Sequence, residues 1–199
     1  MSVSLQPARA LTATLAFSAG LACSGRAQRQ AVQPPAARED SVSARPKDTT
    51  SAPAQWLVAD SAARTVRLTL EVAAPAGAPS ALLNGLRAGA ARITVPLGWT
   101  VQWDWRNADA GAPHSLVVMV QREKIPLEGG RPSFTNARTR MVTEGLAAGQ
   151  TDHTSFEADE AGWYWLMCGV PGHALKGEWL ELRVDQAAGT AGVQIKTGK

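Results

Sequence analysis

The segment WYWLMCGVPGHALKGEWLELRV, residues 163–184, contains two strand-like runs joined by a short loop. The first run, Trp163 to Cys168, is rich in aromatic and aliphatic residues, and the second, Glu178 to Val184, alternates apolar with charged residues. Both patterns are typical of β-strands. Pro171-Gly172 between the runs indicates a tight turn. The segment therefore predicts two strands connected by a loop that carries a cysteine and a histidine.

Similar short runs, separated by Gly, Pro and Asn, precede this segment. Further strands are expected at Gln55 to Ala59, Thr65 to Val72, Arg92 to Val95, Thr100 to Arg106, Ser115 to Val120 and Thr154 to Ala158. Strands of this length and spacing argue for an antiparallel sandwich or barrel, so the expected fold class is all-β. The less regular stretch 121–151 is expected to form a long connection with at most one short helix.

The two ends of the chain differ in composition from its centre. Residues 1–22 contain a single basic residue followed by an apolar run too short to span a bilayer, which predicts a signal peptide. Residues 23–54 are rich in Ala, Pro, Gln, Arg, Ser and Thr and predict a disordered linker. All seven Trp lie between, so one domain is expected over 55–186, followed by a disordered tail over 187–199.

Cys23 and Cys168 are the two cysteines of the chain, and their settings differ too much to predict a disulfide between them. Cleavage after Ala22 would make Cys23 the first mature residue, in a context that resembles a bacterial lipoprotein signal. Cleavage after Ala27 would instead discard Cys23 with the leader. The sequence therefore predicts an exported protein, periplasmic or at the cell surface, which is either lipid-anchored or free.

The formal net charge of +3 does not indicate a nucleic-acid-binding surface. Between positions 55 and 185 acidic residues outnumber basic ones, 14 against 12. The basic excess lies in the N-terminal segment and at the C-terminus. We expect no nucleic-acid partner.

Three side chains can supply a metal site. Cys168 and His173 lie five residues apart across a turn, and His114 begins an upstream strand. One thiolate and two imidazoles, with a weak fourth ligand, form the donor set of a blue-copper site. Thiolate, imidazole and carboxylate donors also suit zinc, so a zinc site remains an alternative.

The chain resembles the cupredoxins, most closely the sulfocyanin-like and rusticyanin-like members. The resemblance rests on four segments, with a weaker one at Asn84-Gly85: Val95-Pro-Leu-Gly-Trp-Thr-Val101, Pro113-His114-Ser115, Ala161-Gly-Trp-Tyr-Trp165 and Cys168-Gly-Val-Pro-Gly-His173-Ala. It implies a Greek-key β-sandwich, one copper ion bound by His114, Cys168 and His173, and single-electron shuttling rather than catalysis. It also implies redox partners such as cytochromes or a terminal oxidase, and a small carrier of this kind is expected to be a monomer. Copper delivery without redox turnover is the alternative function.

Position 178 departs from the family pattern, since relatives with this loop length carry Met there and this chain has Glu178. Period-two alternation directs Met167 and Met119 away from the ligands, and Met141 lies in the irregular connection. Glu178 is therefore the candidate for the axial position. It could instead face solvent or pair with Lys176.

Simpler interpretations compete with each of these assignments. Cys168 could be a buried structural thiol, or it could form a catalytic pair with a histidine, although no residue is evidently placed to orient that histidine. His153 is expected to be a solvated loop residue. Ser115, which follows the first histidine, is expected to hold the ligand loop through its hydroxyl.

Overall fold

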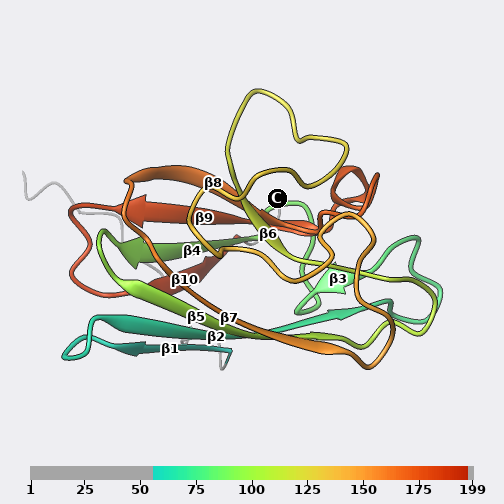
Figure 1. Ribbon diagram of the computed structural model, residues 1–199, viewed down its shortest axis with the longest axis horizontal. Helices are drawn as coiled ribbons and strands as arrows, with labels where there is room; N and C mark the ends of the chain where they lie inside the picture. Colours follow the sequence, from blue (N-terminus) through green and yellow to red (C-terminus); the bar gives the residue numbers. More distant parts are fainter. Residues whose placement is uncertain (1–55, 197–199) are drawn as a thin grey trace, which may run out of the picture. The chain divides into compact units, whose positions relative to one another are not determined.

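The computed structural model describes residues 56–196, which form two β-sheets packed face to face (Figure 1). The first sheet has the strand order β1 (Leu57–Asp60), β2 (Thr65–Ala73), β5 (Thr100–Asn107), β7 (Thr151–Glu157), and the short β3 (Leu82–Leu83) pairs with β2. The second has the order β10 (Gly192–Ile195), β4 (Ala91–Pro96), β9 (Trp179–Asp185), β8 (Gly162–Met167), β6 (Val117–Val120). The all-β Greek-key sandwich predicted from the sequence is confirmed.

Two of the strand pairings are parallel and link distant parts of the chain. β2 pairs with β5 in the first sheet, and β4 pairs with β9 in the second. The remaining pairs are antiparallel. Each sheet therefore combines strands from both halves of the described chain, and the connections between the sheets gather at the ends of the sandwich (Figure 1).

The main core lies between the sheets and follows the alternation of the strands. On β2, every second residue from Val66 to Val72 is buried, and β5 directs Trp103 and Trp105 into the same layer. Leu180, Leu182 and Val184 of β9 face them from the second sheet. Burial of these large apolar side chains is the main stabilising contribution to such a sandwich.

A second apolar cluster covers the outer face of the second sheet. It contains Val117 of β6, Trp165 and Met167 of β8, and Val142 and Ala174 from the loops. β8 is thus buried on both faces, which explains its uninterrupted apolar sequence. Residues 121–150, which connect β6 to β7, cover this outer face and contain no helix in the structure.

The expectation of a disordered tail over 187–199 was wrong for residues 192–195, which form β10 and pair with β4. The apolar side chains of Val193 and Ile195 pack against the main core, which gives this short strand a reason to dock. The predicted signal peptide and linker, Cys23 included, lie outside the described residues. Within the described part, no helix is both long and apolar enough to cross a membrane.

Candidate metal centre

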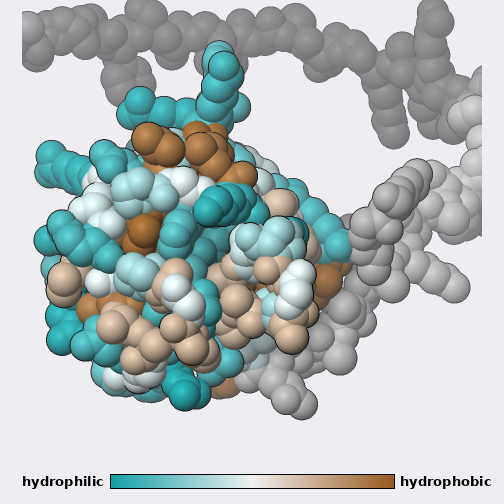
Figure 2. All heavy atoms as spheres, turned by 90° about the vertical axis from the view of Figure 1, so that its right-hand side faces the viewer, coloured by the Kyte–Doolittle hydropathy of each residue, from teal (hydrophilic) through white to brown (hydrophobic). Residues whose placement is uncertain are grey.

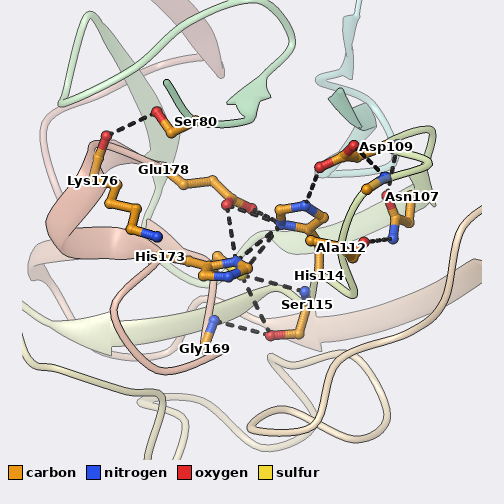
Figure 3. A network of polar contacts seen from close by, with 12 residues as sticks. Ser80, Asn107, Asp109, Ala112, His114, Ser115, Gly169, His173, Lys176 and Glu178 are labelled. Atoms are coloured by element: carbon orange, nitrogen blue, oxygen red, sulfur yellow. Dashed lines mark hydrogen bonds and ion pairs between the residues drawn. The ribbon is translucent and has the colours of Figure 1, made fainter. Parts of the chain in front are cut away.

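The segments that carry four grouped donor side chains meet at the end of the sandwich shown on the right of Figure 1. The four side chains are His114, Cys168, His173 and Glu178, and their ligating atoms all lie within 4.8 Å of one another. His114, Cys168 and Glu178 are buried, and His173 is partly exposed. Figure 3 shows the two imidazoles and the carboxylate directed toward a common point.

Three of the four side chains come from one loop between β8 and β9. Cys168 directly follows β8, and its N–H donates to the carbonyl of Glu178 at 3.1 Å, which closes the base of the loop. Gly172 and Gly177 have φ of +81° and +99°, a region that favours glycine, and they flank the 3-10 turn η1 (Ala174–Lys176). These turns bring His173 back over the cysteine, so the local sequence positions both residues.

His114 reaches the site from the opposite side, on the connection between β5 and β6. Its N–H donates to the carbonyl of Leu146 at 3.1 Å, and the N–H of Leu146 donates back to the carbonyl of His114 at 2.7 Å. Gly145, the residue before Leu146, has φ of +76°, and a Cβ on it would lie 2.9 Å from the backbone nitrogen of His114. Glycine at 145 therefore permits the close approach of the two segments.

The spacing of the donor atoms fits a metal ion. The Cys168 Sγ lies 3.9 Å from Nδ1 of His114 and 3.6 Å from Nδ1 of His173, and the two Nδ1 atoms are 3.2 Å apart. A triangle with these sides has its centre about 2.1 Å from each corner, within the usual range of metal–nitrogen and metal–sulfur bonds of about 2.0–2.3 Å. Both oxygens of Glu178 lie 3.0 Å from Nδ1 of His114 and complete the group.

Ser115 connects the two ligand segments, as the sequence analysis expected. Its hydroxyl donates to the carbonyl of Val142 at 2.6 Å and accepts from the N–H of Gly169 at 2.9 Å. The backbone N–H of Ser115 points at the Cys168 Sγ, 3.4 Å away. One small buried residue thus ties the histidine segment to the cysteine loop and directs a donor at the sulfur.

Sequence reasoning missed Asp109 and Asn107. The Asp109 Oδ2 accepts from Nε2 of His114 at 2.9 Å, on the side of the ring away from the donor group (Figure 3). The side chain of Asn107 accepts from the N–H of Asp109, and Asp109 accepts in turn from the N–H of Gly111. The spacing Asn-x-Asp-x-Gly before His114 is typical of consecutive Asx turns and could have indicated an ordered loop.

Electrostatics couple the histidine and the glutamate. Burial alone would lower the pKa of His114, but hydrogen bonds to Glu178 and then Asp109 outweigh it, so the pKa is raised above its ordinary value. Burial alone would raise the pKa of Glu178, yet hydrogen bonds from His114 and His173 hold it below its ordinary value. A carboxylate is thus the favoured form of Glu178 beside the donor atoms.

The cysteine is poorly suited to nucleophilic catalysis. Burial, and after it the charge of Glu178, raise the pKa of the Cys168 thiol well above its ordinary value. Catalytic cysteines have lowered pKa values and partial exposure, and Cys168 is 1% exposed. A metal ion, which displaces the thiol proton directly, accounts for such a buried cysteine better.

The remaining candidates lie away from the donor group. Met167 is part of the second apolar cluster, Met119 packs against it, and Met141 is largely exposed. His153 is exposed as expected, but it lies on β7 rather than in a loop, and its Nδ1 is 2.7 Å from Asp104. Glu178 is buried among the donors and so does not face solvent.

Comparison with known proteins identifies relatives of the chain. Residues 52–193 match the model of the sulfocyanin (SoxE) domain family. The sulfocyanin of Sulfolobus acidocaldarius is 29% identical over 126 residues, which cover 60% of this chain and 63% of that protein. The chain thus aligns with less than two thirds of that relative.

Two solved structures, of rusticyanin and of auracyanin, were also matched. Rusticyanin from Thiobacillus ferrooxidans is 23% identical, with a TM-score of 0.42 and coverage of 66% of this chain and 88% of rusticyanin. Auracyanin from Roseiflexus castenholzii is 22% identical, with a TM-score of 0.38 and coverage of 59% and 96%. The family match spans most of the chain and includes all four donor residues, so this chain belongs to the sulfocyanin family of cupredoxins, whose cofactor is one copper ion.

Proposed function

We propose that this protein is a type 1 copper electron carrier, which shuttles single electrons between extracytoplasmic redox partners. Cys168, His114 and His173 would hold the copper ion, with Glu178 as the candidate fourth donor. The bound copper supplies one-electron chemistry by alternating between Cu(II) and Cu(I). The observation that carries the proposal is the triangle of one sulfur and two nitrogens, assembled from two distant segments at bonding distances from one centre.

The scaffold supports this role by holding the donors still. His114 is fixed by its backbone pairing with Leu146, and the cysteine loop is closed at its base and tied to Ser115. Donors that barely move between the two oxidation states require little reorganisation when an electron arrives. An electron carrier benefits from this rigidity, whereas a delivery protein must release its metal.

His173 provides the route to the surface. Its side chain is 17% exposed, against 2% for that of His114. Leu175 on the same loop is largely exposed, as is Leu127, whose carbonyl accepts from the N–H of Gly172. Figure 2, which views this end of the sandwich, shows apolar side chains interspersed with polar ones. We infer that electrons enter and leave through His173.

Glu178 is proposed to lower the reduction potential relative to a site with a neutral axial ligand. A buried carboxylate adds one negative charge, which disfavours the reduced, less positive ion in a low-dielectric setting. Glu178→Met should therefore raise the midpoint potential by at least about 60 mV, which corresponds to a tenfold change in the affinity for Cu(I) relative to Cu(II). The control Glu157→Met changes an exposed residue of β7 and should leave the potential unchanged. An unchanged potential in Glu178→Met would remove Glu178 from the site.

The spectrum of the copper-loaded protein, with and without ascorbate, tests the function directly. A Cu(II)–thiolate site absorbs intensely in the visible and bleaches on reduction, and strong binding by Glu178 would shift the colour from blue toward green or red. Cys168→Ser should abolish the band. A colourless protein that holds copper only as Cu(I) would support copper delivery, and preferential retention of zinc would support a zinc site.

The cellular setting is part of the same proposal. The N-terminal segment is proposed to export the domain, with residues 23–54 as a tether that lets the domain reach its partners. Cleavage after Ala22 would make Cys23 the point of lipid attachment. Partners of the expected kind are cytochromes or a terminal oxidase, and the carrier is proposed to act as a monomer. Mass spectrometry of the mature protein would identify the cleavage site and any lipid on Cys23.

A further inference from the structure

We propose that Asp109 is a positioning residue for the copper site, acting through His114; this inference rests on the proposed function. The Asp109 Oδ2 lies 2.9 Å from Nε2 of His114, and the side chains of these residues are 11% and 2% exposed. Figure 3 shows Asp109 and Glu178 on opposite sides of the imidazole. The ring is thus held between two carboxylates.

The carboxylate of Asp109 is itself fixed. Its Oδ1 accepts from the N–H of Gly111 at 2.8 Å, and its own N–H donates to Oδ1 of Asn107 at 2.8 Å. Asn107 is fully buried and donates from Nδ2 to the carbonyls of Ala112 and Leu146 at 3.0 and 2.9 Å. The loop that begins at the end of β5 is therefore ordered around the oxygen that faces His114.

This contact supports the tautomer of His114 that binds a metal ion through Nδ1. Each ring nitrogen faces a carboxylate, Nδ1 that of Glu178 and Nε2 that of Asp109. With a metal ion on Nδ1, the proton of the neutral ring is on Nε2, and Asp109 accepts a hydrogen bond from it. Nδ1 is the atom that faces Cys168 and His173. A carboxylate behind a ligating histidine fixes the orientation of the ring and makes it a stronger donor.

The charge of Asp109 also favours the more positive oxidation state. The Asp109 carboxyl group accepts from the N–H of Gly111 and from Nε2 of His114, and hydrogen bonds of this kind favour its charged form. Through the imidazole, this negative charge stabilises Cu(II) more than Cu(I). A cavity of about 270 Å³ borders Asp109, His114 and Glu178 and admits solvent. Because solvent screens the charge, Asp109 should change the affinity for Cu(II) relative to Cu(I) by about tenfold.

Two substitutions separate the charge from the hydrogen bond. Asp109→Asn keeps an acceptor oxygen and removes the charge, so it should shift the relative affinity toward Cu(I) by about tenfold, a rise of 59 mV in midpoint potential. Asp109→Ala removes both, so it should also weaken metal binding about 10- to 100-fold. The matched control is Asp104→Asn, which neutralises an aspartate paired with the exposed His153 on the first sheet.

Nuclear magnetic resonance of the reduced, diamagnetic copper protein can detect the ring N–H of His114 directly. This signal distinguishes loss of the Asp109 hydrogen bond from a general loss of stability. The ring N–H of His114 should give a slowly exchanging, downfield signal in the wild type and in Asp104→Asn, and this signal should be lost or exchange rapidly in Asp109→Ala. Equal potentials in Asp109→Asn and Asp104→Asn, together with an unchanged ring N–H in Asp109→Ala, would overturn the proposal.

Zinc-loaded protein separates this inference from the proposed function. If the wild type gave no coloured copper site, the electron-carrier function would fail. The zinc affinities and the ring N–H signal of the zinc forms would still test Asp109. A 10- to 100-fold loss of zinc affinity in Asp109→Ala would support its positioning role, and wild-type affinity would refute it.

Discussion

Replacing Asn107 with alanine should destabilise the protein and loosen the segment that carries His114. The buried amide of Asn107 makes three hydrogen bonds: Nδ2 donates to the carbonyls of Ala112 and Leu146, and Oδ1 accepts from the N–H of Asp109. The substitution removes all three. The carbonyl of Leu146 keeps its hydrogen bond from His114, but the other two groups lose their partner.

The magnitude follows from the surroundings of those groups. An orphaned buried polar group costs about 1–3 kcal/mol. Asp109 and Ala112 are only partly buried, so we take about 1 kcal/mol for each of their two backbone groups. With the lost bond to Leu146 included, Asn107→Ala should lower the free energy of unfolding by about 3 kcal/mol. For a domain of this size, that corresponds to a fall in Tm of about 6–12 °C.

Urea unfolding of the metal-free protein, followed by tryptophan fluorescence, measures this change. Gln194→Ala is the control, because Gln194 is exposed on β10 and should alter stability by less than about 0.5 kcal/mol. Titration with copper should also show weaker binding by Asn107→Ala, since the His114 segment is no longer held. A destabilisation below about 1 kcal/mol would mean that water replaces the amide and that the loop is ordered by other contacts.

Three further changes should have measurable effects. Gly169→Ala places a Cβ in steric conflict with a methyl carbon of Val142, so it should lower the free energy of unfolding in urea by about 1–3 kcal/mol and alter the visible spectrum. Burial would raise the pKa of Glu181, but hydrogen bonds from Lys196 and Arg92 outweigh burial and lower it. The Glu181 carboxylate therefore stabilises the folded state at pH values above its ordinary pKa. This stabilisation is lost as the pH falls through the lowered pKa. Glu181→Gln should therefore reduce Tm near neutral pH by an amount that vanishes in acid. Removing copper with a chelator should lower Tm, because free copper at 100 times its Kd stabilises the folded state by about 2.7 kcal/mol.

The parts of this fold that were predictable are those determined by local pattern. The alternation on β2 and the aromatic run of β8 are visible in the sequence, because one face or both faces of each strand are buried. His173 could be placed near Cys168, because the turn between them is short and contains Pro171-Gly172. Their approach to His114 was expected from the donor set and from the family resemblance, not from any local pattern.

The parts that could not be predicted depend on contacts between distant segments. β10 contains two apolar residues in a polar, glycine-containing stretch, and it becomes a strand because β4 offers an open edge. Asp109 is one acidic residue among many until the loop places its oxygen behind His114. Glu178 could be proposed from its position after His173, but its burial depends on how the loop closes.

The position of β4 has a consequence for the order in which the protein is assembled. β4 lies between β9 and β10, and Arg92 of β4 pairs with Glu181 across 89 residues of sequence. Long-range pairings of this kind slow folding, because closing a large loop precedes any compensating contact. The second sheet cannot be completed until the last strand has been synthesised. We therefore expect the domain to fold slowly, with the docking of β10 on β4 as a late step.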